Sequence, residues 1–228
     1  MNVFITGANR GIGLEFVKQY LLKKYHIIAT CRDPDNAKEL KQLESNNSSL
    51  LQIYKLNVTD EHSILYLVKK LKNTPIDILI NNAGIFPESE EFGGINTDIM
   101  INTFVTNAIA PIKICEHFYP NVALSSKKTI VTISSTAGSI EYKNTGGRYA
   151  YRASKAALNM IIKIASIDLK KYDINVILLH PGWVRTDMGT DKAPLSVSKS
   201  VEGMIKVIYQ KKDNSLCFYD WQGNILPW

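Results

Sequence analysis

The sequence predicts a three-layer α/β fold, in which a doubly wound parallel sheet of seven strands carries helices on both faces. Three observations predict it. Short apolar segments alternate with segments whose apolar residues recur at helical spacing along the 228 residues. The first apolar segment, residues 3–6, runs directly into a glycine-containing turn. The segment 76–80 is dominated by isoleucine and leucine, which is typical of a strand buried on both faces.

The alternation of elements also sets the topology. Strands are expected at 3–6, 27–30, 50–56, 76–80, 129–133, 174–179 and 216–219. Helices are expected at about 12–24, 36–43, 97–125, 149–171 and 198–211, and a further one, capped by Thr59 or Asp60, runs through Leu71. Strands joined by helical crossovers lie parallel, because such crossovers are right-handed. No repeat or long linker divides the chain, so residues 1–228 are expected to form one domain.

Composition excludes several classes of protein. The net charge of +6 comes from scattered lysines without an arginine-rich run, so a nucleic-acid partner is not expected. No apolar run approaches the roughly 20 residues that span a bilayer, and no leader precedes the first strand. Cys31, Cys115 and Cys217 are widely spaced and odd in number, which argues against disulfides and a metal site. A cytoplasmic protein without a membrane partner is therefore expected.

The glycine turn after the first strand has the spacing Gly7, Gly11 and Gly13, and a helix follows it at once. Glycines let the backbone approach a pyrophosphate, and a helix N-terminus offers N–H groups and a partial positive charge to an anion. A glycine cluster alone is weak support, but its place between the first strand and the first helix makes it strong. The turn therefore predicts a dinucleotide-binding Rossmann fold.

The choice between NAD and NADP follows from charge. An acidic residue at the end of the second strand accepts the ribose 2′-hydroxyl of NAD, whereas a 2′-phosphate needs cations. Here the second strand ends at Arg32, and the glycine turn adds Arg10. Asp33 is the competing residue, one position beyond Arg32, and is expected to face solvent. Two guanidinium groups can bind a phosphate, so NADP(H) is the expected cofactor.

Tyrosine and lysine occur four residues apart at three places: Tyr20/Lys24, Tyr66/Lys70 and Tyr151/Lys155. Only the third pair has Ser154 between its members and follows a strand that ends in two serines. On a helix this spacing places both side chains on one face. A phenol has an unperturbed pKa near 10, and a neighbouring ammonium brings this pKa toward the working range. The pair is therefore suited to proton transfer during hydride chemistry on a carbonyl.

These motifs together resemble the short-chain dehydrogenase/reductase family along almost the whole chain. The matches are the glycine turn, the run Asn81 to Gly84, Asn107, Ser134 with Ser135, the Tyr-Arg-Ala-Ser-Lys run at 151–155, and Pro181 with Gly182. Within the family the chain is most similar to sniffer-type carbonyl reductases and C-factor-like proteins. The stretches at 30–32, 146–158 and 180–189 and the Leu-Pro-Trp tail at 226–228 carry that similarity.

The resemblance implies a role for each matching residue. Tyr151 would be the general acid/base, Lys155 would also hold the nicotinamide ribose, Asn107 would order a relaying water, and Ser135 would bind the substrate oxygen, with Ser134 as the neighbouring candidate. The implied cofactor-binding residues are Gly7, Asn9, Arg10, Gly11, Ile12, Gly13, Arg32, Asn57, Val58, Asn82, Ala83, Gly84, Tyr151, Lys155, Pro181, Gly182, Val184 and Thr186. Asn57 departs from the family's aspartate, but its amide oxygen can still accept a hydrogen bond from adenine.

Substrate contacts are expected in the segments 85–92, 136–148 and 183–195, which follow the carboxyl ends of strands. Phe86, Ile140, Tyr142 and Trp183 would form an apolar pocket for an aldehyde, ketone or quinone. Two alternatives remain open: an NADP(H)-binding redox sensor or signalling protein, and a biosynthetic reductase acting on an acyl-carrier or pterin substrate. The family pattern favours a homodimer that pairs through the helices near 100–125 and 149–171.

Overall fold

The computed structural model describes residues 1–88, 90–142, 145–211 and 217–228. Seven strands form one parallel sheet in the order β3-β2-β1-β4-β5-β6-β7. The strands are β1 (Asn2–Thr6), β2 (His26–Cys31), β3 (Leu51–Lys55), β4 (Ile78–Asn81), β5 (Thr129–Ile133), β6 (Asn175–His180) and β7 (Phe218–Asp220). The order reverses direction between β1 and β4. The predicted doubly wound parallel fold is confirmed.

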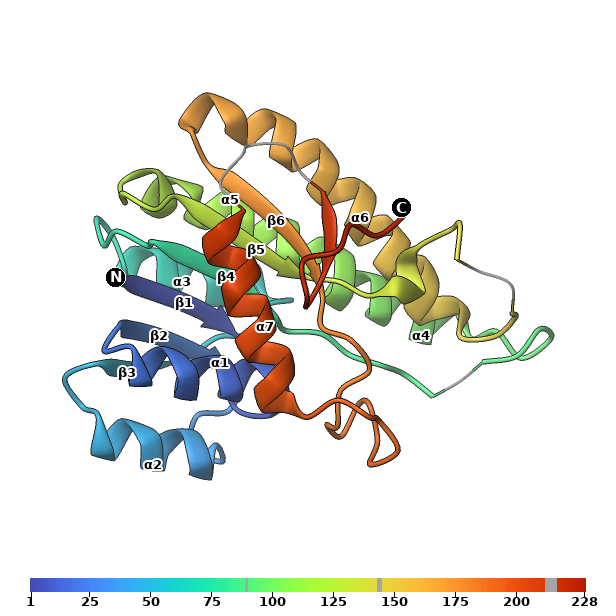
Figure 1. The fold of residues 1–228 in the computed structure, drawn as a ribbon, viewed down its shortest axis with the longest axis horizontal. Helices are drawn as coiled ribbons and strands as arrows, with labels where there is room; N and C mark the ends of the chain where they lie inside the picture. Colours follow the sequence, from blue (N-terminus) through green and yellow to red (C-terminus); the bar gives the residue numbers. More distant parts are fainter. Residues whose placement is uncertain (89, 143–144, 212–216) are drawn as a thin grey trace.

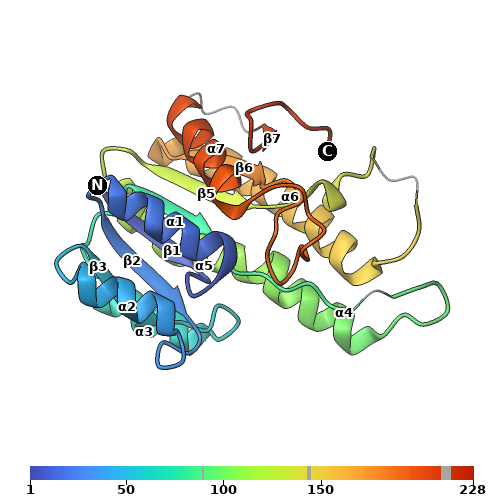
Figure 2. The same ribbon diagram turned by 60° about the horizontal axis from the view of Figure 1, so that its bottom comes forward.

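Helices cover both faces of the sheet (Figures 1 and 2). The helices α1 (Gly11–Leu22), α2 (Lys38–Asn46) and α7 (Val197–Gln210) pack on one face with the side chains of Val3, Ile5, Ile80, Val131 and Leu179. The helices α3 (Glu61–Lys70), α5 (Ala110–Ala123) and α6 (Tyr149–Leu169) cover the other face against Phe4, Ile28, Leu79, Ile130 and Leu178. Successive strand residues point to opposite faces, which is why neighbouring residues belong to different cores.

The expected helical region 97–125 consists of three consecutive segments. The helix α4 (Thr97–Phe104) runs into the π-helix η1 (Val105–Ile109), and α5 follows directly. A π turn adds a residue to the helical repeat and often lies at a functional site. Asp60, one of the two expected caps, accepts a hydrogen bond from His62 N at 3.0 Å and begins α3. Leu216, where the last strand was expected to begin, lies outside the described residues.

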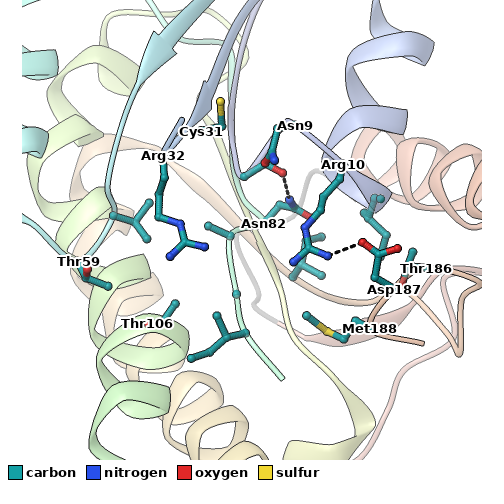
Figure 3. A pocket seen from close by; sticks show the side chains of 18 of the residues that line it. Asn9, Arg10, Cys31, Arg32, Thr59, Asn82, Thr106, Thr186, Asp187 and Met188 are labelled. Carbon is teal, nitrogen blue, oxygen red and sulfur yellow. Dashed lines mark hydrogen bonds and ion pairs between the residues drawn. The ribbon is translucent and has the colours of Figure 1, made fainter. Parts of the chain in front are cut away.

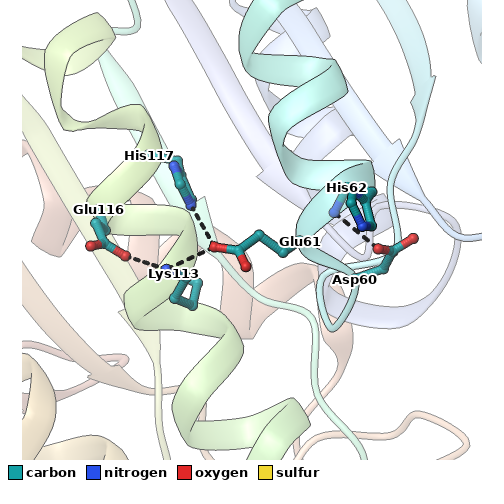
Figure 4. A network of polar contacts seen from close by, with 6 residues as sticks. All are labelled: Asp60, Glu61, His62, Lys113, Glu116 and His117. Atoms are coloured by element: carbon teal, nitrogen blue, oxygen red, sulfur yellow. Dashed lines mark hydrogen bonds and ion pairs between the residues drawn. The ribbon is translucent and has the colours of Figure 1, made fainter.

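A surface network joins α3 to α5 (Figure 4). Glu61 Oε1 lies 3.1 Å from Lys113 Nζ and 3.7 Å from His117 Nε2, and Lys113 also binds Glu116 Oε2 at 2.6 Å. These groups are partly exposed, so each pair adds little to the free energy of unfolding. Among the described residues, no helix combines the length and the apolar character that a bilayer crossing needs.

Candidate functional site

A cavity of about 400 Å³ opens at the carboxyl ends of the strands. It lies where the strand order reverses between β1 and β4, which is the position where open α/β sheets bind ligands. Fifteen of the residues implied by the sequence line it: Gly7, Asn9, Arg10, Gly11, Ile12, Arg32, Asn57, Val58, Asn82, Ala83, Gly84, Tyr151, Lys155, Pro181 and Thr186. Gly13, Gly182 and Val184, which the sequence also implied, do not line the cavity.

The glycine turn has the close backbone packing that a dinucleotide cradle requires. Gly7 has φ +64°, and a Cβ there would lie 3.0 Å from the Ala83 Cα. A Cβ at Gly13 would lie 2.2 Å from the Gly7 carbonyl oxygen, so only glycine lets α1 begin so near the turn. The Asn82 Nδ2 donates to the carbonyl oxygens of Thr6 and Gly7 at 2.9 and 3.1 Å, which ties the turn to β4. The cavity floor therefore fits a pyrophosphate.

The α1 N-terminus and two arginines make this part of the cavity electropositive. α1 has no side-chain cap at Arg10, so no side chain competes there with an incoming anion. Figure 3 shows Arg10 and Arg32 extending toward the same part of the cavity. Asp33 is exposed and lines the cavity, and its carboxylate accepts hydrogen bonds from the side chain and backbone of Asn36 in the same loop at 2.5 and 3.3 Å. The charge arrangement fits a 2′-phosphate.

Arg10 also binds a residue that sequence patterns did not single out. Its Nη1 lies 2.6 Å from Asp187 Oδ2, an ion pair between the glycine turn and the loop after β6 (Figure 3). The two side chains are 60% and 77% exposed, so water screens the pair and its contribution to stability is small. Asp187 therefore acts as a weak competitor for the Arg10 guanidinium.

Asn57 closes a turn before α3. Its Oδ1 accepts hydrogen bonds from the backbone N and the Oγ1 of Thr59 at 3.3 and 2.9 Å. The oxygen expected to accept from adenine is thus already engaged in this structure. The side chain still lines the cavity beside Val58.

Tyr151 lies in the first turn of α6, is partly buried and lines the cavity. Burial raises the pKa of Tyr151 above its usual value, while a hydrogen bond with the Ser135 side chain and the Arg148 charge lower this pKa. The Phe86 ring packs edge-on against the Tyr151 ring, with centroids 4.6 Å apart. Phe86 therefore holds one side of the phenol and shields it from water.

Lys155 lies one helical turn beyond Tyr151 and is 7% exposed. Its Nζ donates to the Ile133 carbonyl oxygen at 3.0 Å and lies 5.9 Å from the centroid of the Tyr151 ring. Burial lowers the pKa of Lys155 from 10.5 to about 8, because desolvation disfavours the ammonium. The amine can therefore gain and lose a proton near neutral pH.

Replacing Lys155 with methionine is expected to stabilise the fold. The folded-state pKa of about 8 lies below the unfolded value near 10.5, so the buried ammonium destabilises the protein fully below pH 8. Each unit of pKa difference between the folded and unfolded states corresponds to about 1.4 kcal/mol in the free energy of unfolding. Loss of the hydrogen bond from Lys155 to the Ile133 oxygen reduces the gain in stability by about 1 kcal/mol. We expect the free energy of unfolding of Lys155→Met at pH 7 to exceed that of wild type by about 1–3 kcal/mol. Its urea unfolding midpoint should therefore lie at a higher urea concentration.

The pH dependence provides the check. Between about pH 8 and 10.5 the unfolded wild-type chain binds more protons than the folded one, so wild-type stability rises and the difference narrows. Lys38→Met, at an exposed position in α2, is the matched control and should change stability little. A Lys155→Met protein less stable than wild type at pH 7 would contradict the expected cost of the buried ammonium.

Asn107 is buried in η1, and its side chain is hydrogen-bonded to the backbone of Ile85 in the segment that follows β4. Its Oδ1 accepts from Ile85 N at 2.8 Å, and its Nδ2 donates to the Ile85 oxygen at 2.9 Å and to Ser154 Oγ at 3.1 Å. Both amide hydrogens are thus engaged with protein. The structure places Asn107 between the cavity wall and α6, and its role in ordering a water stays a prediction.

The two serines at the end of β5 point in different directions. Ser134 Oγ donates to Asn159 Oδ1 at 2.6 Å in the buried interface with α6. Ser135 Oγ accepts from Ala137 N at 3.1 Å and bonds with the Tyr151 side chain. This alternation follows from the extended backbone. Ser135 is therefore the serine that bonds with Tyr151, although Ser134 and not Ser135 lines the cavity.

None of the four residues expected to touch substrate, Phe86, Ile140, Tyr142 and Trp183, lines the cavity. Ile140, Tyr142 and Trp183 are 78%, 50% and 57% exposed, whereas Phe86 contacts Tyr151. The Trp183 Nε1 donates to the Gly189 carbonyl oxygen at 2.7 Å, which braces the loop after β6. Contact between these four residues and a substrate stays a prediction.

The cavity is also lined by residues to which the sequence assigned no cofactor contact: Cys31, Asp33, Leu56, Thr59, Ile85, Asn102, Thr106, Ile133, Ser134, Asp187 and Met188. Several are neighbours of predicted residues along the chain, as Thr106 is of Asn107. Asp187 and Met188 follow Thr186 and lie in the segment 183–195, which was expected to contact substrate.

Comparisons with known proteins agree with this geometry. A family model described as short chain dehydrogenase matches residues 1–195. The C-signal protein of Myxococcus xanthus is 39% identical over 155 residues, which cover 68% of this chain and 93% of that protein. The carbonyl reductase Sniffer of D. melanogaster superposes with a TM-score of 0.95 at 34% identity and covers 100% of this chain and 99% of that one.

A second solved structure contains a cofactor. The NADPH-bound carbonyl reductase from chicken fatty liver is 36% identical, with a TM-score of 0.91, and covers 100% of this chain and 98% of that one. The resemblance inferred from the motifs is therefore confirmed by sequence and by fold. Because the family model spans most of the chain and the relatives exceed 30% identity, this protein belongs to the short-chain dehydrogenase family.

Proposed function

We propose that this protein is an NADPH-dependent reductase of small carbonyl compounds, with Tyr151 as the general acid. The observation that carries the proposal is that one cavity joins Arg10 and Arg32 to Tyr151 and Lys155. β2 lies on one side of β1 and β5 on the other, so the arginines and the tyrosine stand at opposite ends of the cavity. In an extended NADP(H) molecule the 2′-phosphate and the nicotinamide also lie at opposite ends.

The preference for NADP(H) rests on charge. Arg10 and Arg32 provide two cations, and Asp33 is held by Asn36. The chicken carbonyl reductase, at 36% identity, was solved with NADPH bound. In the proposed complex, Gly7, Gly11 and Ile12 would hold the pyrophosphate at the α1 N-terminus, Asn57 and Val58 would hold the adenosine, and Lys155 would hold the nicotinamide ribose.

The bound cofactor would supply a hydride to the carbonyl carbon. Ser135, which bonds with the Tyr151 side chain, would bind the carbonyl oxygen and orient it toward the phenol. Tyr151 would then donate its proton to the developing alkoxide, and the Lys155 ammonium would stabilise the phenolate that remains. The phenolate recovers its proton from solvent through Lys155, whose pKa of about 8 suits proton exchange near neutral pH.

The test is an absorbance assay at 340 nm with purified protein, NADPH or NADH, and a panel of aldehydes, ketones and quinones. We expect NADPH consumption with at least one class of small carbonyl and far slower consumption with NADH. Tight NADPH binding without turnover on a broad panel would contradict general carbonyl reduction and favour a narrow biosynthetic substrate or a sensor.

We retain a signalling protein that binds NADP(H) as the second candidate, because the relative at 39% identity is named C-signal. A pure sensor would have no need of the proton-transfer residues. The two functions therefore differ in the assay: a sensor binds NADPH without consuming it.

We also propose that the protein forms a homodimer through α6. Met160, Ile164 and Ile167 are 62%, 53% and 59% exposed and recur at helical spacing on one face. Such an apolar face typically marks an interface. By light scattering after size exclusion, we expect a wild-type dimer and a monomeric Ile164→Glu variant, whereas Leu65→Glu on α3 should stay dimeric. A wild-type monomer at micromolar concentration would contradict this.

We further propose that residues 1–228 act as a single domain in the cytoplasm. One sheet contains all seven strands, and the two cores lie on its two faces. Cys31, Cys115 and Cys217 are free thiols, which suits a reducing compartment.

A further inference from the structure

Glu90 is a buried acid that the proposed chemistry does not use. It lies between β4 and α4, and only 6% of it is exposed. Its Oε2 accepts a hydrogen bond from Ala150 N at 2.9 Å, and its backbone oxygen accepts from Arg148 N at 2.9 Å. These two bonds join a segment near β4 to the start of α6, sixty residues later in the chain.

The first of these bonds is a helix cap supplied from a distant segment. Arg148 is the N-cap residue of α6 and makes no side-chain cap of its own. Ala150 is the second residue of the helix, and its N–H is one of those that a helix leaves without an internal partner. A carboxylate there also interacts favourably with the helix dipole. Glu90 thus performs the task that an N-cap side chain usually performs.

The second of these bonds, made by the Glu90 backbone oxygen, reaches the phenol through two neighbours. Arg148 has a left-handed backbone with φ +57°, a conformation that non-glycine residues rarely adopt without support. The bond from Arg148 N to the Glu90 oxygen supplies such support, and the Arg148 guanidinium lies 5.4 Å from the centroid of the Phe86 ring. Phe86 in turn packs on Tyr151. The carboxylate of Glu90 therefore holds the first turn of α6, which carries Tyr151, while its backbone oxygen holds Arg148 beside Phe86.

Stability alone is a poor explanation for this arrangement. The second carboxylate oxygen of Glu90, Oε1, is buried and makes no hydrogen bond among the described residues. Burying a carboxylate oxygen without a partner costs free energy, and a serine or aspartate at the N-cap would satisfy the helix more simply. Such a costly polar group is usually retained where it serves a site.

We propose that Glu90 is a positioning residue for the reductase reaction: its carboxylate caps α6 from across the chain and holds the Tyr151 phenol in reacting geometry. The assignment rests on the proposed function, since it concerns the placement of the general acid. Small displacements of a reacting group strongly reduce rate, with about 10²-fold lost for 1 Å. Loss of the cap should therefore lower kcat more than it affects cofactor binding.

The experiment compares Glu90→Ala and Glu90→Gln, with 4-nitrobenzaldehyde and NADPH as the probe pair. At saturating concentrations and 15 °C we expect Glu90→Ala to lower kcat by about tenfold or more, with the NADPH dissociation constant within about threefold of wild type. Glu90→Gln keeps an oxygen that accepts from Ala150 N, so it should retain kcat within about threefold. Hydrogen exchange should accelerate in the peptide 148–156 for Glu90→Ala and much less for Glu90→Gln.

Asp60→Ala is the matched control, because Asp60 caps α3 with the same kind of carboxylate-to-amide bond (Figure 4). It should lower the melting temperature but leave kcat unchanged at saturating NADPH. A Glu90→Ala protein that lost only melting temperature, as Asp60→Ala does, would overturn the assignment. A wild-type protein that reduced no carbonyl would instead contradict the proposed function, so the two failures are distinguishable.

Discussion

Tyr151→Phe is expected to lower kcat for carbonyl reduction by about 10³-fold while leaving NADPH binding within about twofold of wild type. A positioned general acid contributes about 10²–10⁴-fold to rate, and phenylalanine removes the proton while keeping the ring. The ring contact with Phe86, at 4.6 Å between centroids, should survive the substitution. The measurements are initial rates at 340 nm and a fluorescence titration with NADPH.

The chain offers a matched control for this substitution. Tyr66 and Lys70 repeat the four-residue spacing on α3, with Lys70 Nζ 5.7 Å from the Tyr66 ring centroid. Tyr66 is 61% exposed and lies outside the cavity, so Tyr66→Phe should keep full activity. If Tyr151→Phe retained more than about a tenth of the wild-type kcat, another group would have to be the acid.

Replacing both Arg10 and Arg32 with alanine is expected to raise the dissociation constant of NADPH by about 10²-fold and that of NADH by less than threefold. Charge-assisted hydrogen bonds contribute about 1.5–3 kcal/mol each, and exposure to solvent places these two at the lower end. Only NADPH has the 2′-phosphate that these cations would bind. Calorimetric titration of both cofactors measures the change in preference.

Two single variants separate the phosphate contact from general charge. Arg185→Ala removes a cation from an exposed position of the loop after β6 that does not line the cavity, so NADPH affinity should change little. Asp187→Asn frees Arg10 from its ion pair at 2.6 Å and should tighten NADPH binding by up to about fivefold. Equal losses of NADPH and NADH affinity in the double arginine variant would disprove the phosphate assignment.

Local sequence patterns predict the strands and helices of the fold, the glycine turn and the Tyr151/Lys155 pair. Apolar spacing placed each strand within a few residues, because burial on both faces of a sheet requires an apolar run wherever a strand lies. Gly7 and Gly13 are also visible in the sequence, because the tight turn that would hold the pyrophosphate requires glycine at these positions. Tyr151 and Lys155 share a helix, so the four-residue spacing that joins them is already visible in the chain.

Tertiary structure decided the contacts between segments that are distant in sequence. Asp187 meets Arg10 across 177 residues, and Glu90 meets Ala150 across 60. Strand alternation predicts that Ser134 and Ser135 point to opposite sides, but only the tertiary contact of Ser134 with Asn159 shows which side each takes. Spacing along a helix or strand reports which face a residue occupies, but the partner on that face depends on how the sheet and its helices pack, and no local pattern encodes this.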